Sequence, residues 1–204
     1  MTARPDLTEV LTSRRMCRDF LPEPVPPAVR ERVLAAAFRG PAAGNTHALD
    51  LVVLEGDDTA RYWDVTLPAP RRAAFRWPGL LLAPLLVVPY VDPAAYVERY
   101  ARADKAATGL GDAAEDWPVP YWFVDGGAAV MAVLLAAEAE GLGALFFGQF
   151  GHEAAVRSAL GVPDGRRALG TLALGRPAPG GRAPSRSATA GRPAAAQHLH
   201  HARW

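Results

Sequence analysis

The chain has 204 residues, half of them hydrophobic, and its 22 basic and 21 acidic residues leave a formal net charge of +1. This length and apolar content predict one sizeable domain with its own core. The near-neutral charge argues against a general nucleic-acid binder, so any anion must be bound by a local cluster of basic groups. The single cysteine, Cys17, excludes an internal disulfide and a cysteine-based metal cluster, and it fits a reducing cytoplasm.

Along the chain, helical patterns alternate with short apolar segments. The strand-like segments are residues 49–56, 83–91 and 168–175, and prolines interrupt the second of them. The helical patterns cover residues 6–11, 26–40, 92–110, 125–143 and 152–162, with a partly helical stretch at 57–79. This alternation predicts a mixed α/β chain. From Arg176 onward the sequence is rich in Pro, Gly and Ser, which predicts an extended tail.

The clearest helical pattern is residues 125–143, where Asp125 is expected to cap the N-terminus and Gly141 and Gly143 to end the helix. The same stretch is the most apolar candidate for a membrane span. It contains Asp125, Glu138 and Glu140, so it favours a buried helix over a span. The N-terminus has no apolar signal core, and we expect a cytoplasmic protein.

Several common motifs are absent from the sequence. No Gly-x-Gly-x-x-Gly follows a strand, and neither a phosphate loop nor a His-Glu-x-x-His occurs. The histidines of "HLHH" (His198, His200 and His201) could chelate a metal, but the tail has no carboxylate near them, so packing or exposure of the tail is favoured. Cys17 has basic neighbours but no evident histidine partner, which favours a buried spectator thiol.

The stretch "RRMCRDF" places Arg14, Arg15 and Arg18 within five positions. On a helix these side chains would diverge, whereas in an extended segment they can surround one small, highly charged group. Arginine forks pair bidentately with phosphate. The two interpretations are therefore a solvated basic loop and a clamp for a phosphate.

Four further segments resolve this choice. They follow "RRMCRDFLPEPVP" in the order "PAAGNTHALDLVVLEG", "VDGGAAVMAVLLAAEAEGLGALFFGQF", "LGVPDGRRALGTLALGRP" and a "GRP" tail that ends in Trp204. Together they resemble the FMN-dependent nitroreductase family over nearly the whole chain. The resemblance implies an α+β fold with a central, mostly antiparallel sheet flanked by helices. It also implies a homodimer, with the long core helix at the interface and residues 176–204 of the single domain 1–204 wrapped around the partner subunit.

The resemblance assigns the arginine segment to FMN. Arg14 and Arg15 would hold the phosphate and the ribityl chain, and Arg18 would reach the pyrimidine edge of the ring. A fixed guanidinium there would stabilise the negative charge of the reduced flavin. Met16 stands where the family usually has serine, so one hydroxyl contact is lost. The tail arginine Arg192 would also hold the phosphate, with Arg186 as the alternative.

Two other segments would complete the flavin site. The loop "PAAGNTHAL" keeps only the proline and asparagine of the family pattern. In the family this loop comes from the partner subunit, and here it offers Asn45 with Ala42, Gly44 and His47. The segment beyond the long helix would lie over the flavin and donate a backbone N–H to flavin N5, and it consists of Leu145, Phe146, Phe147 and Gly148. Core packing is the alternative for these four residues.

The resemblance implies hydride transfer from NADH or NADPH to FMN and then to a nitroaromatic, a quinone or another conjugated acceptor. No catalytic side chain and no metal are required, because flavin N5 is the reactive atom. Candidate pocket residues are Tyr100, Lys105, Trp117 and Tyr121, and surface or core roles are the favoured alternative for each. The alternatives are a non-catalytic or degenerate flavin-binding protein and a specialised flavin-dependent oxidase of the same superfamily. No nucleic-acid or membrane partner is expected.

Overall fold

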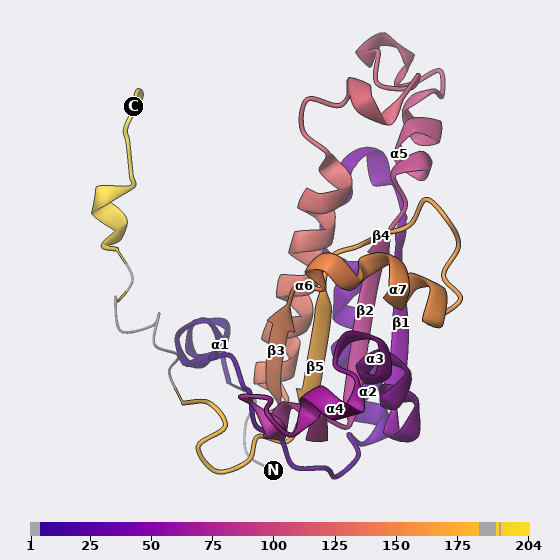
Figure 1. Cartoon of the computed structure of the whole chain (residues 1–204). Helices are drawn as coiled ribbons and strands as arrows, with labels where there is room; N and C mark the ends of the chain where they lie inside the picture. The colour runs from indigo at the N-terminus through magenta and orange to yellow at the C-terminus, as the bar shows by residue number, and fades with distance from the viewer. Residues whose placement is uncertain (1–4, 184–190, 192) are drawn as a thin grey trace.

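A computed structural model describes residues 5–183, 191 and 193–204 of the chain. Its sheet has the strand order β1-β2-β5-β3, and every strand pair in it is antiparallel (Figure 1). The strands are β1 (Leu49–Glu55), β2 (Leu85–Val91), β3 (Gly143–Phe147), β4 (Arg167–Ala168) and β5 (Thr171–Gly175), and β4 pairs with β2. The predicted class, helices around a mostly antiparallel sheet, is confirmed.

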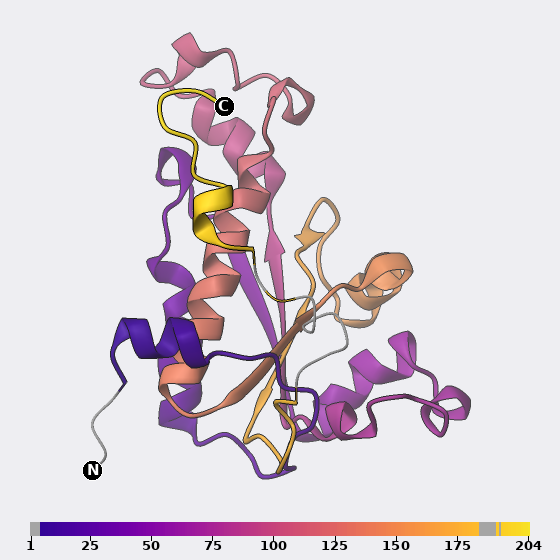
Figure 2. The ribbon, with the colours of Figure 1, turned by 90° about the vertical axis from the view of Figure 1, so that its left-hand side faces the viewer.

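Helices cover both faces of the sheet. The long α6 (Tyr121–Ala139) lies on one side, and the shorter α3, α4 and α7 lie on the other (Figures 1 and 2). Successive side chains of β2 point to opposite faces of the sheet. Leu85 and Val87 belong to the core beneath α6, whereas Leu86 and Val88 belong to the core beneath α3 and α7. All seven residues of β2 are therefore buried, as expected for a central strand covered on both faces.

The helices are short apart from α6. Their bounds are α1 (Leu7–Ser13), α2 (Pro27–Ala35), α3 (Thr59–Thr66), α4 (Ala69–Arg72), α5 (Pro93–Tyr100), α6 (Tyr121–Ala139) and α7 (Glu153–Ala159). Short 3₁₀ segments lie between these elements and in the tail: η1 (Ala36–Arg39), η2 (Ala43–Asn45), η3 (Gly56–Asp58), η4 (Pro78–Leu82), η5 (Ala106–Thr108), η6 (Ala114–Asp116), η7 (Phe150–His152) and η9 (Ala195–Gln197).

Three sequence-based boundaries were wrong. The strand β2 runs through Pro89 without a break. On the edge of β2 away from β1, β5 pairs with the residues before Pro89 and β4 pairs with those after it. The helix predicted for 92–110 ends at Tyr100 and gives way to turns. The helix predicted from Asp125 begins four residues earlier, at Tyr121, so Asp125 is not its cap. Its carboxylate instead accepts hydrogen bonds from the backbone N–H of Ala43 at 2.7 Å and from the hydroxyl of Tyr96 at 2.8 Å.

By length and composition alone, α6 could cross a membrane, and it is the helix of the described residues that meets this test. Its buried residues, including Ala129, Val133 and Ala137, pack against the sheet. The packing of this face of α6 against the sheet therefore agrees with the expectation of a buried core helix.

The arginine segment runs extended beside the edge strand β3. The backbone N–H of Cys17 donates to the carbonyl of Ala144 at 2.8 Å, and that of Arg18 donates to the carbonyl of Gly181 at 2.9 Å. The segment is thus fixed between β3 and the root of the tail. Successive side chains of an extended segment point in opposite directions, so Cys17 enters the core while Arg18 faces the other way.

This arrangement depends on a glycine in β3. A Cβ atom at Gly143 would come within 2.7 Å of the Cys17 sulfur and 2.8 Å of its Cβ, both inside the packed core. We expect Gly143→Ala to lower the free energy of unfolding by about 1–3 kcal/mol, measured by urea denaturation. Gly151→Ala is the matched control, because a Cβ there meets nothing within 4 Å, and we expect it to change stability by less than about 0.5 kcal/mol. Equal stability of the two variants would contradict this account.

Candidate functional site

An open cavity of about 430 Å³ lies where β3 ends, and we call it the aromatic cavity. Its lining comes from the arginine segment, α3, η4 and the end of β3, and consists of Arg18, Tyr62, Trp63, Thr66, Leu67, Phe75, Trp77, Leu80, Leu145, Phe146, Phe147, Gly148, Gln149, Phe150 and His152. Arg18 and residues 145–148 are far apart in the sequence, and each was assigned to the flavin. The fold brings these two groups to one cavity.

The walls of the aromatic cavity are flat and mostly apolar. The rings of Trp63 and Phe147 are stacked, with an interplanar angle of 3° and centroids 6.1 Å apart. Tyr62 meets both rings edge-on, at 5.1 and 6.2 Å. Phe150, 91% exposed, has a positive φ of 45°, and its ring lies over Gly148. A planar aromatic ligand suits such walls.

A short polar chain runs behind these rings. The side-chain amide of Gln149 donates to the hydroxyl of Thr171 at 3.1 Å, and Thr171 donates to the hydroxyl of Tyr62 at 2.9 Å. Burial raises the pKa of Tyr62 to about 12, so this hydroxyl keeps its proton at neutral pH. Two buried polar atoms of the cavity residues have no partner, the amide oxygen of Gln149 and the indole nitrogen of Trp63.

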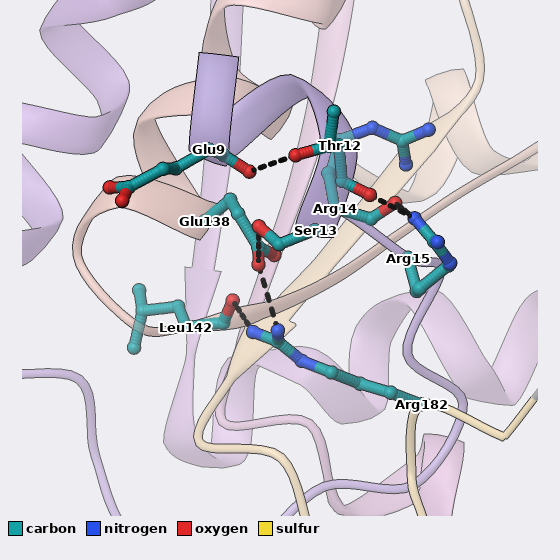
Figure 3. A network of polar contacts seen from close by, with 8 residues as sticks. All are labelled: Glu9, Thr12, Ser13, Arg14, Arg15, Glu138, Leu142 and Arg182. Carbon is teal, nitrogen blue, oxygen red and sulfur yellow. Dashed lines mark hydrogen bonds and ion pairs between the residues drawn. The ribbon is translucent and has the colours of Figure 1, made fainter. Parts of the chain in front are cut away.

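The other two arginines of the segment lie at the end of α1 (Figure 3). Arg15 donates to the carbonyls of Thr12 at 2.7 Å and of Arg14 at 2.9 Å, so in this structure it satisfies the last carbonyls of the helix. Arg14 has a buried guanidinium nitrogen without a partner. Neither side chain lines the aromatic cavity. Met16 packs against both core layers, where the family serine would offer a hydroxyl.

Sequence reasoning missed Arg182. It donates to Glu138 of α6 at 2.9 Å and to the carbonyl of Leu142 at 2.9 Å, and Glu138 also accepts from Ser13 at 2.9 Å (Figure 3). The carboxylate thereby joins α1, α6 and the root of the tail. No sequence signal marks Arg182, because it stands in a Gly- and Pro-rich stretch where arginine is common.

Cys17 is fully buried, and burial raises the pKa of its thiol despite the nearby charges of Arg182 and Arg18. A thiol that stays protonated is a poor nucleophile. The prediction that Cys17 is buried is confirmed.

The asparagine loop lies at a different hollow from the aromatic cavity. The hollow beside it is lined by Pro41, Ala42, Asn45, His47 and Asp125, among others. The loop is well supported: Asp125 accepts from its backbone, as described above, and Arg99 donates to the carbonyl of Gly44 at 2.7 Å. Asn45 adopts a positive φ of 57°, and its side chain and that of His47 are exposed. Within one chain the loop and Arg18 are not brought together.

The four predicted pocket residues form one aromatic cluster beside this loop. Trp117 is buried and donates its indole N–H to the carbonyl of Leu110 at 3.0 Å. Tyr100 lies 4.6 Å and Tyr121 6.2 Å from its ring centroid, and the Lys105 ammonium lies 5.6 Å from the ring of Tyr100. Trp117 thus belongs to the core, whereas Tyr121 and Lys105 are more exposed.

The tail is described in part. Arg186 and Arg192 lie outside the described residues. Residues 193–204 stand apart from the rest of the chain in Figure 1, with His198, His200 and His201 exposed. His200 stacks on Trp204, which is 99% exposed. The prediction that Trp204 packs on a partner subunit stays a prediction.

Comparisons with known proteins give a consistent result. A sequence model of the Nitroreductase family matches residues 11–176. An NADH dehydrogenase of Thermus thermophilus is 30% identical over 188 residues, which cover 85% of this chain and 87% of that protein. The solved structure of a putative NADH dehydrogenase/NAD(P)H nitroreductase from Bacteroides thetaiotaomicron has a TM-score of 0.68 at 19% identity and covers 97% of both chains. An FMN-dependent nitroreductase from Clostridium difficile has a TM-score of 0.67 at 16% identity, covering 97% of this chain and all of that one.

Proposed function

The chain belongs to the nitroreductase family, and from this premise we propose that it is an FMN-dependent oxidoreductase that uses NADH or NADPH to reduce a small conjugated acceptor. The observation that carries the proposal is the aromatic cavity, where Arg18 and the end of β3 meet. The names of the similar proteins, an NADH dehydrogenase and an FMN-dependent nitroreductase, support the same chemistry.

The residues present fit FMN by their chemistry. A flavin ring is planar and apolar on its faces, as are the walls of the cavity, and its edge carries both hydrogen-bond donors and acceptors. The buried, unpartnered atoms of Gln149 and Trp63 supply one acceptor and one donor. A phosphate fits the buried, unpartnered guanidinium nitrogen of Arg14, because a buried charged donor without a partner is costly.

In this proposal Arg14 holds the phosphate, and Arg18 and the backbone at residues 145–148 hold the ring. The cofactor supplies the hydride-transferring atom when bound. The protein positions the ring, lines it with apolar groups that exclude water, and places the positive charge of Arg18 where negative charge develops. Tyr62 keeps its proton at neutral pH and acts as the end of a hydrogen-bonded chain.

A second copy of the chain completes the site in this proposal. Asn45 and His47 stand exposed on a well-supported loop that is separate from the aromatic cavity. The aromatic cluster of Tyr100, Lys105, Trp117 and Tyr121 lies beside that loop, since a Cβ at Gly44 would come within 2.7 Å of the ring of Tyr100. A homodimer that places this end of one chain at the aromatic cavity of the other would unite all of these residues around one flavin.

The direct test is the absorption spectrum of the purified protein. We expect a yellow protein with flavin absorption bands that bleach on anaerobic addition of NADH or NADPH and return when a quinone or a nitroaromatic is added. A yellow protein that neither donor bleaches would support a flavin-binding module without this activity. A colourless protein that cannot be reconstituted with FMN would contradict the proposal.

A further inference from the structure

The aromatic cavity contains one buried acceptor whose hydrogen bond the protein does not supply. Gln149 is 5% exposed and is one of the residues that line the cavity. Its Oε1 atom has no hydrogen-bond partner. A buried amide oxygen without a hydrogen bond costs about as much as a lost hydrogen bond. A molecule bound in the cavity with an N–H or O–H group would supply the missing donor if it met this oxygen.

The orientation of this amide is fixed from behind. Gln149 Nε2 donates to Thr171 Oγ1, and Thr171 donates onward to Tyr62, whose hydroxyl is held in the core. Thr171 is fully buried in β5, so the chain of hydrogen bonds has a rigid base. Because the amide nitrogen of Gln149 donates to Thr171, the amide oxygen is the atom left without a partner, and it can only accept a hydrogen bond.

Two donors accompany this acceptor. The indole Nε1 of Trp63 is buried without a partner, and the guanidinium of Arg18 lines the same cavity. The residues that line the cavity thus include two with donor groups and one with an unpartnered acceptor, among mostly apolar side chains. The pyrimidine edge of a flavin is complementary in kind, with a carbonyl oxygen, the N3–H group and a second carbonyl oxygen.

We propose that Gln149 is a specificity-determining residue whose amide oxygen accepts the N3–H of the flavin, with Trp63 and Arg18 donating to the flanking carbonyls. This inference rests on the proposed function and adds to it the residue that recognises the pyrimidine edge of the flavin ring. Thr171 and Tyr62 are positioning residues for the amide. A site built around such a hydrogen bond rejects an analogue that lacks it.

The test compares FMN with 3-methyl-FMN, in which a methyl group replaces the N3 hydrogen. Dissociation constants for the apoprotein are measured by quenching of flavin fluorescence, without any turnover. We expect the wild-type protein to bind 3-methyl-FMN at least about tenfold more weakly than FMN. Gln149→Met keeps the length and packing of the side chain but has no acceptor, and we expect it to bind the two flavins equally.

Two further variants separate the roles. Trp63→Phe removes the indole N–H, and we expect weaker binding of both flavins with the preference for FMN retained. Thr171→Val releases the amide, and we expect the preference to fall towards that of Gln149→Met. Equal binding of both flavins by the wild-type protein, or a preference that survives in Gln149→Met, would overturn the inference and leave the proposed function intact. Failure of the wild-type protein to bind either flavin would overturn both.

Discussion

FMN is expected to raise the melting temperature of the apoprotein by about 5–10 °C when it is present at a hundredfold excess over its dissociation constant. Such an excess stabilises the folded state by about 2.7 kcal/mol, and for a chain of this size each kcal/mol corresponds to about 2–4 °C. The physical reason is that a bound phosphate gives the buried, unpartnered nitrogen of Arg14 a charged acceptor. Scanning fluorimetry with and without FMN measures the shift.

Riboflavin and two arginine variants locate the origin of this shift. Riboflavin has the ring but no phosphate, so we expect it to produce a smaller shift. Arg14→Ala should weaken FMN binding by about 1.5–3 kcal/mol, a loss of at least tenfold, and should leave riboflavin binding unchanged. Without ligand the variant should be no less stable than the wild type, because it removes an unpartnered buried group. Arg61→Ala is the control, since Arg61 forms an exposed ion pair with Asp58 and should not affect FMN.

An equal shift with riboflavin and FMN, or an unchanged FMN affinity in Arg14→Ala, would show that Arg14 does not bind the phosphate. No shift with either flavin would contradict flavin binding altogether. The two outcomes are distinguishable, so the assignment of Arg14 can be rejected while the family assignment stands.

The fold was predictable where short-range pattern decides the structure. The apolar runs that became β1 and β5 and the long apolar run of α6 follow from periodicity. Of the two glycines expected to end α6, Gly141 follows its last turn with a positive φ of 74°, whereas Gly143 is the first residue of β3. The start of α6 was not predictable in this way. Asp125 has the chemistry of a cap, but tertiary partners on η2 and α5 use its carboxylate four residues into the helix.

The candidate site was predictable only in part, because it depends on contacts between distant segments. Arg18 and residues 145–148 came from the resemblance, and the fold places them at one cavity. Gln149 carries no sequence signal, since its importance comes from Thr171, which lies 22 positions away, and from Tyr62, which lies 109 positions from Thr171. Arg182 was missed for the same reason, because its partner Glu138 lies 44 positions away.

An apolar stripe along α6 leads to the prediction with the largest effect on assembly. Tyr121, Val124 and Met131 recur at spacings of three and seven, which places them on one helix face, and all three are exposed. Leu7 and Leu11 of α1 are also exposed, and α1 lies beside α6 on the same side of the sheet (Figure 2). A surface of this kind is typical of a protein interface.

We expect Val124→Glu to convert the proposed homodimer into monomers and to release the proposed flavin, because a carboxylate buried at an interface without a partner costs about 3–5 kcal/mol. Leu82→Glu is the matched control, since Leu82 is 50% exposed, against 51% for Val124, and lies in η4, whose Leu80 packs in the core beneath α3 and α7 rather than beneath α6. Light scattering after size exclusion gives the mass, and the ratio of flavin to protein absorbance gives the occupancy. A monomeric wild-type protein that keeps its flavin would contradict the shared site. So would a Val124→Glu variant that remains a yellow dimer, because in the proposed site Asn45 and Arg18 would meet at one ring only when two chains are joined.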